Sequence, residues 1–178
     1  MGSKEHRSRY ALPEPYPEIR VANKNIFYAK LLLDDFASSG SELNAILQYL
    51  YHHFRFAHGN LKDIADLTEG VAIVEMHHME MLGELILKLG GNPRYHSFQN
   101  DSGQYYSGAY VYYGHAVLDM LAADIEAERG AIEQYRRHAE QIQDPYVQAV
   151  LRRIIKDEEY HLSLFKEAYQ RYQGMKKD

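Results

Sequence analysis

The sequence predicts an all-α protein, a four-helix bundle in which a long crossover loop joins the second and third helices. Apolar residues recur at helical spacing through four long stretches, and no stretch alternates with the two-residue period of a strand. The segment 94–114 between the second and third stretches has no helical period. With 178 residues, 46% of them hydrophobic, the chain is long enough to bury one sizeable core.

The N-terminal residues predict an extended arm. Pro13, Pro15 and Pro17 follow one another closely, and each fixes φ and lacks the amide hydrogen that a helix needs. We expect the arm to lie on the surface of the bundle or on a partner subunit. The predicted organisation is an arm over 1–22, a bundle over 23–173 and a C-terminal tail over 174–178.

Capping residues and breaks place the helices. The first is expected to begin near Asn25 and is interrupted at 38–41, where Ser41 is a candidate N-cap for a second piece, so the two pieces are interpreted as separate or as one kinked helix. Gly90-Gly91-Asn92-Pro93 stops the second helix, and Asp144 followed by Pro145 starts the fourth. The second, third and fourth helices are predicted over 61–89, 115–142 and 144–172.

The segment 94–114 is rich in tyrosine and glycine. A connection of this length is unusual inside a compact domain, but parallel neighbouring helices in a bundle require one. The tyrosines between 105 and 113 either line a substrate channel or relay electrons, or they belong to a loop that covers the bundle or a dimer partner.

Two Glu-x-x-His patterns are the candidate functional residues. Glu75 and His78 lie in the second helix, and Glu158 and His161 lie in the fourth. Residues i and i+3 project from one face of a helix, so each pair offers a carboxylate and an imidazole to one point. Four-helix bundles hold two metal ions in this way when each of the other two helices supplies one more glutamate.

An internal repeat nominates those two glutamates. The pattern Glu-x-x-Ala-Ile-x-Gln-Tyr starts at Glu42 and again at Glu128. The two copies and the two Glu-x-x-His pairs have similar offsets, which indicates two related helix pairs. Four carboxylates would balance the charge of two divalent cations, and Tyr49 and Tyr135, two turns after their glutamates, are candidate hydrogen-bond donors to the ligands.

Composition excludes several classes of function. The net charge of −5, without basic runs interleaved with aromatics, argues against nucleic-acid binding. The absence of cysteine excludes disulfides, iron–sulfur clusters, thiol catalysis and a rubredoxin-type iron site. No apolar run approaches a membrane span and residues 1–9 lack a signal-peptide pattern, so we expect a cytoplasmic protein without a membrane partner.

These motifs resemble the ferritin-like superfamily of dimetal-carboxylate proteins. The stretch 75–93 resembles the second helix of bacterioferritin, and 106–165 is similar to rubrerythrin, manganese catalase and spore-coat relatives. The resemblance implies terminal ligands at Glu42 and Glu128, bridging ligands at Glu75 and Glu158, and one histidine on each metal. The metal-ligand and catalytic set implied is Glu42, Glu75, His78, Glu128, Glu158 and His161.

The resemblance also implies a function. We expect two Fe or two Mn ions and an oxidoreductase that acts on H2O2 or O2 as a peroxidase or catalase, in a homodimer or higher homo-oligomer. One alternative is a ferroxidase or iron-storage protein of bacterioferritin type that acts on Fe(II); another is a structural or coat-associated bundle held together by metal. Haem is not expected, and Met76 is interpreted as a packing residue.

Overall fold

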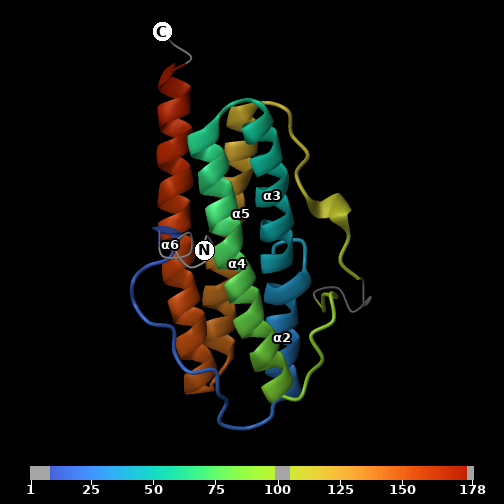
Figure 1. The fold of residues 1–178 in the computed structure, drawn as a ribbon. Helices are drawn as coiled ribbons and strands as arrows, with labels where there is room; N and C mark the ends of the chain where they lie inside the picture. Colours follow the sequence, from blue (N-terminus) through green and yellow to red (C-terminus); the bar gives the residue numbers. More distant parts are fainter. Residues whose placement is uncertain (1–8, 99–104, 176–178) are drawn as a thin grey trace, which may run out of the picture.

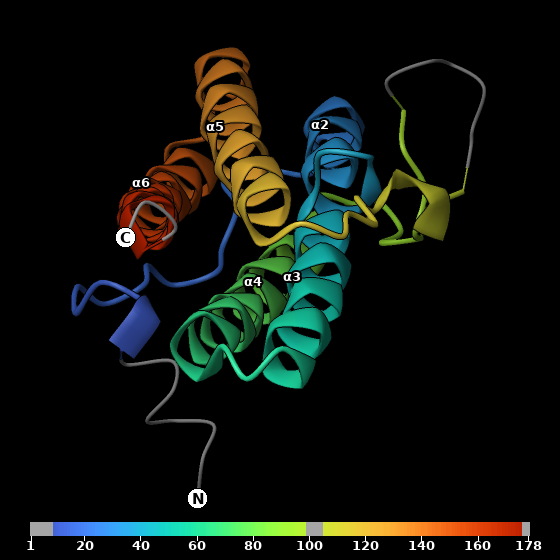
Figure 2. The same cartoon turned by 90° about the horizontal axis from the view of Figure 1, so that it is seen from above.

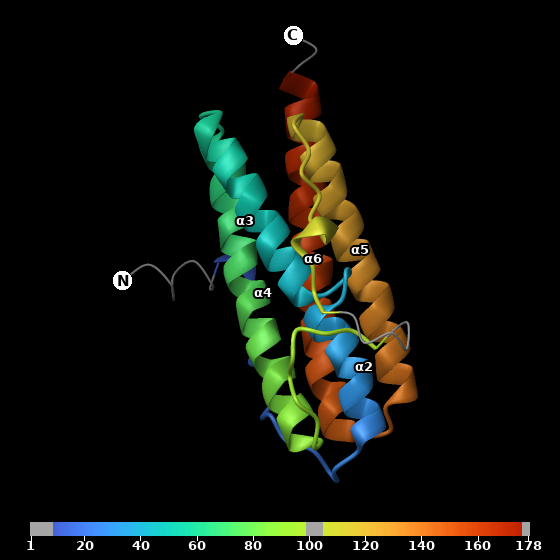
Figure 3. The same ribbon diagram turned by 90° about the vertical axis from the view of Figure 1, so that its right-hand side faces the viewer.

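This computed structural model describes residues 9–98 and 105–175, in which the secondary structure is helical. α2 and α3 lie end to end and together form one member of a four-helix bundle with α4, α5 and α6 (Figures 1 and 3). Among the described residues, extended pairing is limited to an isolated bridge between His96 and Tyr105. The all-α prediction is therefore confirmed. The elements are α2 (Ile26–Ala37), α3 (Glu42–His58), α4 (Lys62–Lys88), the 3-10 turn η1 (Gly108–Tyr110), α5 (Val117–Gln141) and α6 (Pro145–Met175).

The connection between α4 and α5 is the predicted crossover. These two helices run in the same direction, so the chain must return along the bundle before α5 starts (Figure 1). Figure 2 shows the connection passing outside α3. It is fixed there because the Tyr106 hydroxyl donates to Asn44 Oδ1 (2.9 Å), the Tyr112 amide donates to Gln48 Oε1 (3.1 Å), and His52 Nε2 lies 3.0 Å from the Tyr112 carbonyl oxygen.

Helix ends follow the predicted caps. The Ser41 side chain accepts from the Asn44 amide at 3.3 Å, so α2 and α3 are separate helices rather than one kinked helix. Gly90, with φ of +93°, turns the chain out of α4, and the Gly91 amide donates to the Ile86 carbonyl at 2.8 Å. This is the glycine-dependent C-terminal motif that satisfies the last carbonyls of a helix.

Two separate apolar clusters fill the bundle, one toward each end. One cluster combines α2 with the C-terminal half of α4, the C-terminal half of α5 and the N-terminal half of α6. The other combines α3 with the opposite halves of the same helices. The middle turns of α4, α5 and α6 lie between the clusters, and polar side chains occupy this layer. Within the described ranges, no helix is both long and apolar enough to cross a membrane.

The N-terminal arm lies against α6 of its own chain. The Arg153 guanidinium donates to the carbonyls of Leu12 (2.9 Å) and Glu14 (3.0 Å), and Lys156 pairs with the Glu14 carboxylate at 2.5 Å. Tyr10 is only 5% exposed and belongs to one of the apolar clusters. The arm is thus packed into the fold. The predicted boundaries at 22 and 173 stay predictions, although α6 continues to Met175, beyond its predicted end.

Asp144 gives the first test of the fold. Its Oδ1 accepts from the amides of Tyr146 (3.0 Å) and Val147 (3.3 Å), and its Oδ2 accepts from the amide of Ala22 in the arm (2.7 Å). We predict that Asp144→Ala lowers the free energy of unfolding, measured in urea, by about 1–2 kcal/mol. Asp144→Asn keeps one cap acceptor and should lose less. Equal losses in the two variants would contradict this role of the cap.

Candidate metal centre

The six predicted site residues converge in the polar layer between the two apolar clusters. Each comes from the middle of a long helix or, for Glu42, from the first residue of α3. Because i and i+3 share a face, Glu75 and His78 on α4 point inward together, as do Glu158 and His161 on α6. None of the six is more than 4% exposed, and they are Glu42, Glu75, His78, Glu128, Glu158 and His161.

Ligand atoms gather around two neighbouring points. One group contains Glu42 and His78, the other contains Glu128 and His161, and both groups contain Glu75 and Glu158. Within each group the candidate ligand atoms lie within 4.8 Å of one another. The arrangement therefore has two shared carboxylates and, on each side, one further carboxylate and one imidazole.

The histidines present Nδ1 to these points. His78 Nδ1 lies 2.8 Å from Glu75 Oε2 and 3.0 Å from Glu158 Oε1, and His161 Nδ1 lies 2.9 Å from Glu75 Oε1. The outer nitrogens have other partners: His78 Nε2 lies 3.1 Å from Asp157 Oδ2, and His161 Nε2 lies 2.9 Å from the Tyr10 carbonyl oxygen.

Several atoms that face the cluster have no hydrogen-bond partner. They are Glu75 Oε1, Glu128 Oε2, Glu158 Oε1 and His161 Nδ1, and the close approach of His161 Nδ1 to Glu75 lacks hydrogen-bond geometry. Unpaired polar atoms inside a protein are costly unless something else compensates them. Buried carboxylate and imidazole atoms that aim at common points are the donor set that divalent transition metals require. The residues present therefore fit a pair of metal ions.

Burial disfavours the ionised form of Glu42 and Glu128, the two carboxylates that each belong to only one group. Desolvation, followed by the charges of Glu75 and Glu158, raises the pKa of Glu42 well above its usual range. The same causes raise the pKa of Glu128. A raised pKa favours the protonated carboxyl, so metal ions would compete with protons for these two groups.

At His78, His161 and Glu158 the neighbouring groups move the pKa so that the charged form is favoured. Burial disfavours the imidazolium of His161, but the nearby carboxylates of Glu75 and Glu158 raise its pKa to about 10. Burial also opposes charge on His78, yet the nearby carboxylates of Asp157, Glu158 and Glu75 raise its pKa. Although burial raises the pKa of Glu158, the two neighbouring histidines lower it below the usual range.

Tyr49 and Tyr135 reach the site crosswise. The Tyr49 hydroxyl on α3 donates to Glu128 Oε1 on α5 at 2.6 Å, and the Tyr135 hydroxyl on α5 donates to Glu42 Oε1 on α3. Each tyrosine thus holds the terminal glutamate of the opposite helix. Burial raises the pKa of both hydroxyls, so they remain neutral donors.

A second layer of polar contacts has the same crossed symmetry and was missed from the sequence. Gln48 and His52 of α3 bind the buried Asp124 of α5, with Gln48 Nε2 at 3.0 Å and His52 Nδ1 at 2.8 Å from Oδ1. His52 is fully buried, so this contact lies in the interior of the bundle.

The matching contacts on the other side join α5 to α2. Gln134 Nε2 and His138 Nδ1 each lie 2.9 Å from Asp35 Oδ1. His52 and His138 are 86 positions apart, the offset of the internal repeat, so a longer comparison of the two copies would have found this pair.

Asp157 is the other functional candidate that sequence reasoning missed. It is fully buried, its Oδ1 lies 2.7 Å from Arg153 Nη1, and it accepts from the Tyr16 hydroxyl. The position of Asp157 directly before Glu158 was the available clue. Met76, interpreted from the sequence as a packing residue, is 46% exposed on α4.

A small cavity reaches the cluster from the break between α2 and α3. Its volume is about 50 Å3, and it touches Glu42, Glu128 and Glu158. Small residues form much of its wall, among them Gly40, Ala45 and Ala131. Only a molecule of a few atoms fits this space.

Comparison with known proteins identifies the family. The protein-family model described as the ferritin-like domain matches residues 38–175, which is most of the chain. The chain belongs to the ferritin-like family. A probable manganese catalase of Clostridium acetobutylicum is 27% identical over 90% of this chain and 79% of its own length. The bacterioferritin of Streptomyces coelicolor is 33% identical over 68% of this chain and 69% of its own length.

Solved structures give the same assignment. The ferritin-like chain superposes on a manganese catalase from Anabaena PCC7120 with a TM-score of 0.81 and 26% identity, over 91% of this chain and 80% of the other. A bacterioferritin of Desulfovibrio desulfuricans gives a TM-score of 0.71 with 25% identity, over 83% and 81% of the two chains. The expected resemblance is confirmed, and both types of relative share the bundle.

The raised pKa values predict how pH affects the metal-free protein. Glu42 and Glu128 stabilise the folded state fully below their unfolded pKa of about 4.5, and His161 does so below about 6.5. All three contributions are lost as pH rises toward the folded-state values. We predict that the melting temperature in EDTA falls between pH 6 and pH 9.

The matched variant is the double substitution Glu42→Gln and Glu128→Gln, which mimics the protonated carboxyls. Its melting temperature should depend less on pH over the same interval. A wild-type melting temperature that rises from pH 6 to pH 9 would contradict the assigned protonation states.

Proposed function

We propose that this protein is a dimetal oxidoreductase that reduces or disproportionates H2O2. The observation that supports it most directly is the pair of overlapping groups that share Glu75 and Glu158. In this proposal two metal ions would share Glu75 and Glu158; Glu42 and His78 would help to hold one of them, and Glu128 and His161 the other. Four carboxylates carry −4 and two divalent cations carry +4, so loading would make the buried site neutral.

The donor set suits iron or manganese. Oxygen and imidazole ligands without thiolate suit both metals, and availability in the cell decides between metals of similar affinity. Bound there, the two metals would supply the redox change that peroxide chemistry requires.

The remaining residues of the chain hold and shape the site. Tyr49 and Tyr135 fix the orientation of the terminal carboxylates by donating to one oxygen of each. The two apolar clusters above and below the layer exclude bulk water.

The reaction class is supported by the size of the access route and by the relatives. A cavity of about 50 Å3 admits H2O2 or O2 but no larger substrate. The relatives named manganese catalase match more of this chain than the bacterioferritins do, at 90% against 68% in sequence and 91% against 83% in structure. We further propose a cytoplasmic protein that forms a homodimer or larger homo-oligomer.

Ferroxidase activity is the second candidate. The bacterioferritin of Streptomyces coelicolor has the higher identity, 33% against 27%, over its shorter match. Fe(II) would then be a substrate as well as a ligand of the cluster, and O2 its oxidant. Oxygen consumption on addition of Fe(II), together with a large hollow assembly, would favour this function over peroxide turnover. A loaded protein with neither activity would favour a structural bundle.

Glu75 tests the shared-carboxylate proposal. We predict that Glu75→Ala, which removes a ligand from both groups, abolishes the binding of two metals per chain and the release of O2 from H2O2. Elemental analysis and an oxygen electrode measure the two outcomes on protein loaded separately with iron and with manganese. Glu80 on the same helix is exposed, so Glu80→Ala serves as the control. Retained metal and turnover in Glu75→Ala would reject the site.

Ala131 tests the access route. A leucine at this position would fill part of the small cavity without removing a ligand. We predict that Ala131→Leu lowers kcat/KM for H2O2 while two metals per chain remain bound. The exposed Gly130 on the same helix has open space around it, so Gly130→Leu is the control. Full turnover in Ala131→Leu would show that substrate arrives elsewhere.

A further inference from the structure

The two histidines of the candidate metal centre differ in their outer partners. The offset of 83 residues that relates Glu75 to Glu158 and His78 to His161 also pairs Val74 with Asp157. Asp157 accepts from His78, but Val74 offers His161 an apolar side chain. The repeat is therefore broken at a place where the ring of a metal-binding histidine normally donates to an acceptor.

The N-terminal arm supplies the missing acceptor. The Tyr10 carbonyl oxygen lies 2.9 Å from His161 Nε2, and both groups are in the buried interior. A carbonyl oxygen can only accept, so Nε2 carries the hydrogen. When His161 is neutral, the lone pair is then on Nδ1, which faces Glu75 and the rest of the cluster.

The arm also touches the partner of His78. The Leu12 amide donates to Asp157 Oδ1 at 2.9 Å, and the Tyr16 hydroxyl donates to Asp157 Oδ2. Arg153 pairs with the same carboxylate and with the carbonyls of Leu12 and Glu14. Both outer partners of the histidines thus belong to the arm or are held by it.

We propose that the N-terminal arm is a working part of the metal site, in which the Tyr10 carbonyl replaces the acidic side chain that the repeat lacks at Val74. The inference rests on the proposed metal site and deepens it. Metal binding fixes His161 in the orientation that the docked arm requires, and the docked arm fixes the tautomer that the metal requires. Each event therefore stabilises the other by the same factor.

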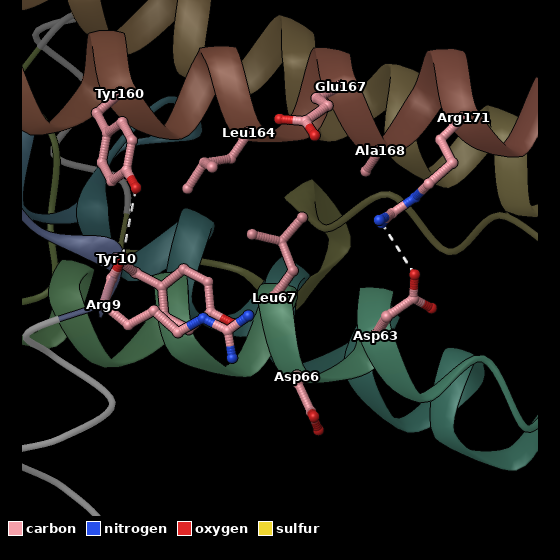
Figure 4. Close-up of a pocket in the computed structure, with 10 residues that line it drawn as sticks. All are labelled: Arg9, Tyr10, Asp63, Asp66, Leu67, Tyr160, Leu164, Glu167, Ala168 and Arg171. Atoms are coloured by element: carbon pink, nitrogen blue, oxygen red, sulfur yellow. Dashed lines mark hydrogen bonds and ion pairs between the residues drawn. The ribbon is translucent and has the colours of Figure 1, made fainter.

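A slot on α4 positions Tyr10. Gly70 lies beneath the tyrosine ring, and a Cβ at this position would overlap ring atoms Cδ2 and Cε2. Figure 4 shows Tyr10 beside α4, with Tyr160 and Leu164 of α6 on the other side. The Tyr160 hydroxyl lies 3.5 Å from the Arg9 carbonyl oxygen. The three atoms nearest to a Cβ at Gly70 all belong to Tyr10, so a larger residue there is expected to displace the arm first.

The test uses the full-length protein and Mn(II) as the probe. We predict that Gly70→Leu weakens Mn(II) binding, measured by competition with a chelator, by about 10- to 100-fold. In the wild type, Mn(II) should slow hydrogen exchange of the amides of Tyr10, Ala11, Leu12, Glu14 and Tyr16, and Gly70→Leu should abolish this protection. Tyr10→Gly removes the ring that packs on Gly70 and should weaken Mn(II) binding in the same way. This variant replaces Gly70→Leu if Gly70→Leu does not fold.

Gly130→Leu is the matched control and should bind Mn(II) as the wild type does. The proposal would be overturned if Mn(II) did not change the exchange of these amides in the wild type. It would also be overturned if a folded Gly70→Leu or Tyr10→Gly variant bound Mn(II) with wild-type affinity. These failures differ from a failure of the proposed function. If the wild type binds no metal, the site itself is wrong; if the wild type binds two and the variants bind equally well, only the role of the arm is wrong.

Discussion

Burial of like charge is the constraint on which the architecture depends. Four glutamates meet in a layer that neither end of the bundle can hydrate, because an apolar cluster lies on each side. Desolvation of an ionised carboxylate costs several kcal/mol, so these side chains need protons, imidazolium groups or metal cations as neighbours. Tyr49 and Tyr135 donate hydrogen bonds to two of these glutamates, and the two histidines point toward the same layer. The tyrosine contacts also join opposite helices.

The crossed contacts turn a sequence repeat into a spatial one. Each terminal glutamate is held by the tyrosine of the other copy, and each buried aspartate of the outer layer is held by the glutamine and histidine of the other copy. Neither copy could satisfy its own polar groups alone. The repeat holds at the six candidate ligands and is broken around them, at Val74 and at the loop before Glu42; the Tyr10 carbonyl of the arm lies at the first of these breaks.

Local sequence patterns predicted much of this structure. Helical period, the Ser41 cap and the glycines at 90 and 91 predicted the helix ends because each acts through neighbouring residues. The six site residues came from spacing and repetition. Tyr10 and Asp157 could not be found in this way, because a backbone carbonyl has no sequence signature and their contacts join residues more than 140 positions apart. The side on which an extended arm lies is decided by packing, here by the slot at Gly70.

The loop between α2 and α3 also shapes the small cavity that reaches the cluster. Asp35 precedes Glu42 by seven residues, whereas its spatial counterpart Asp124 precedes Glu128 by only four, so one copy carries three additional residues at this place. Those residues form part of the rim of the small cavity. Because Gly40 in this insertion has no side chain, the backbone itself borders the cavity there.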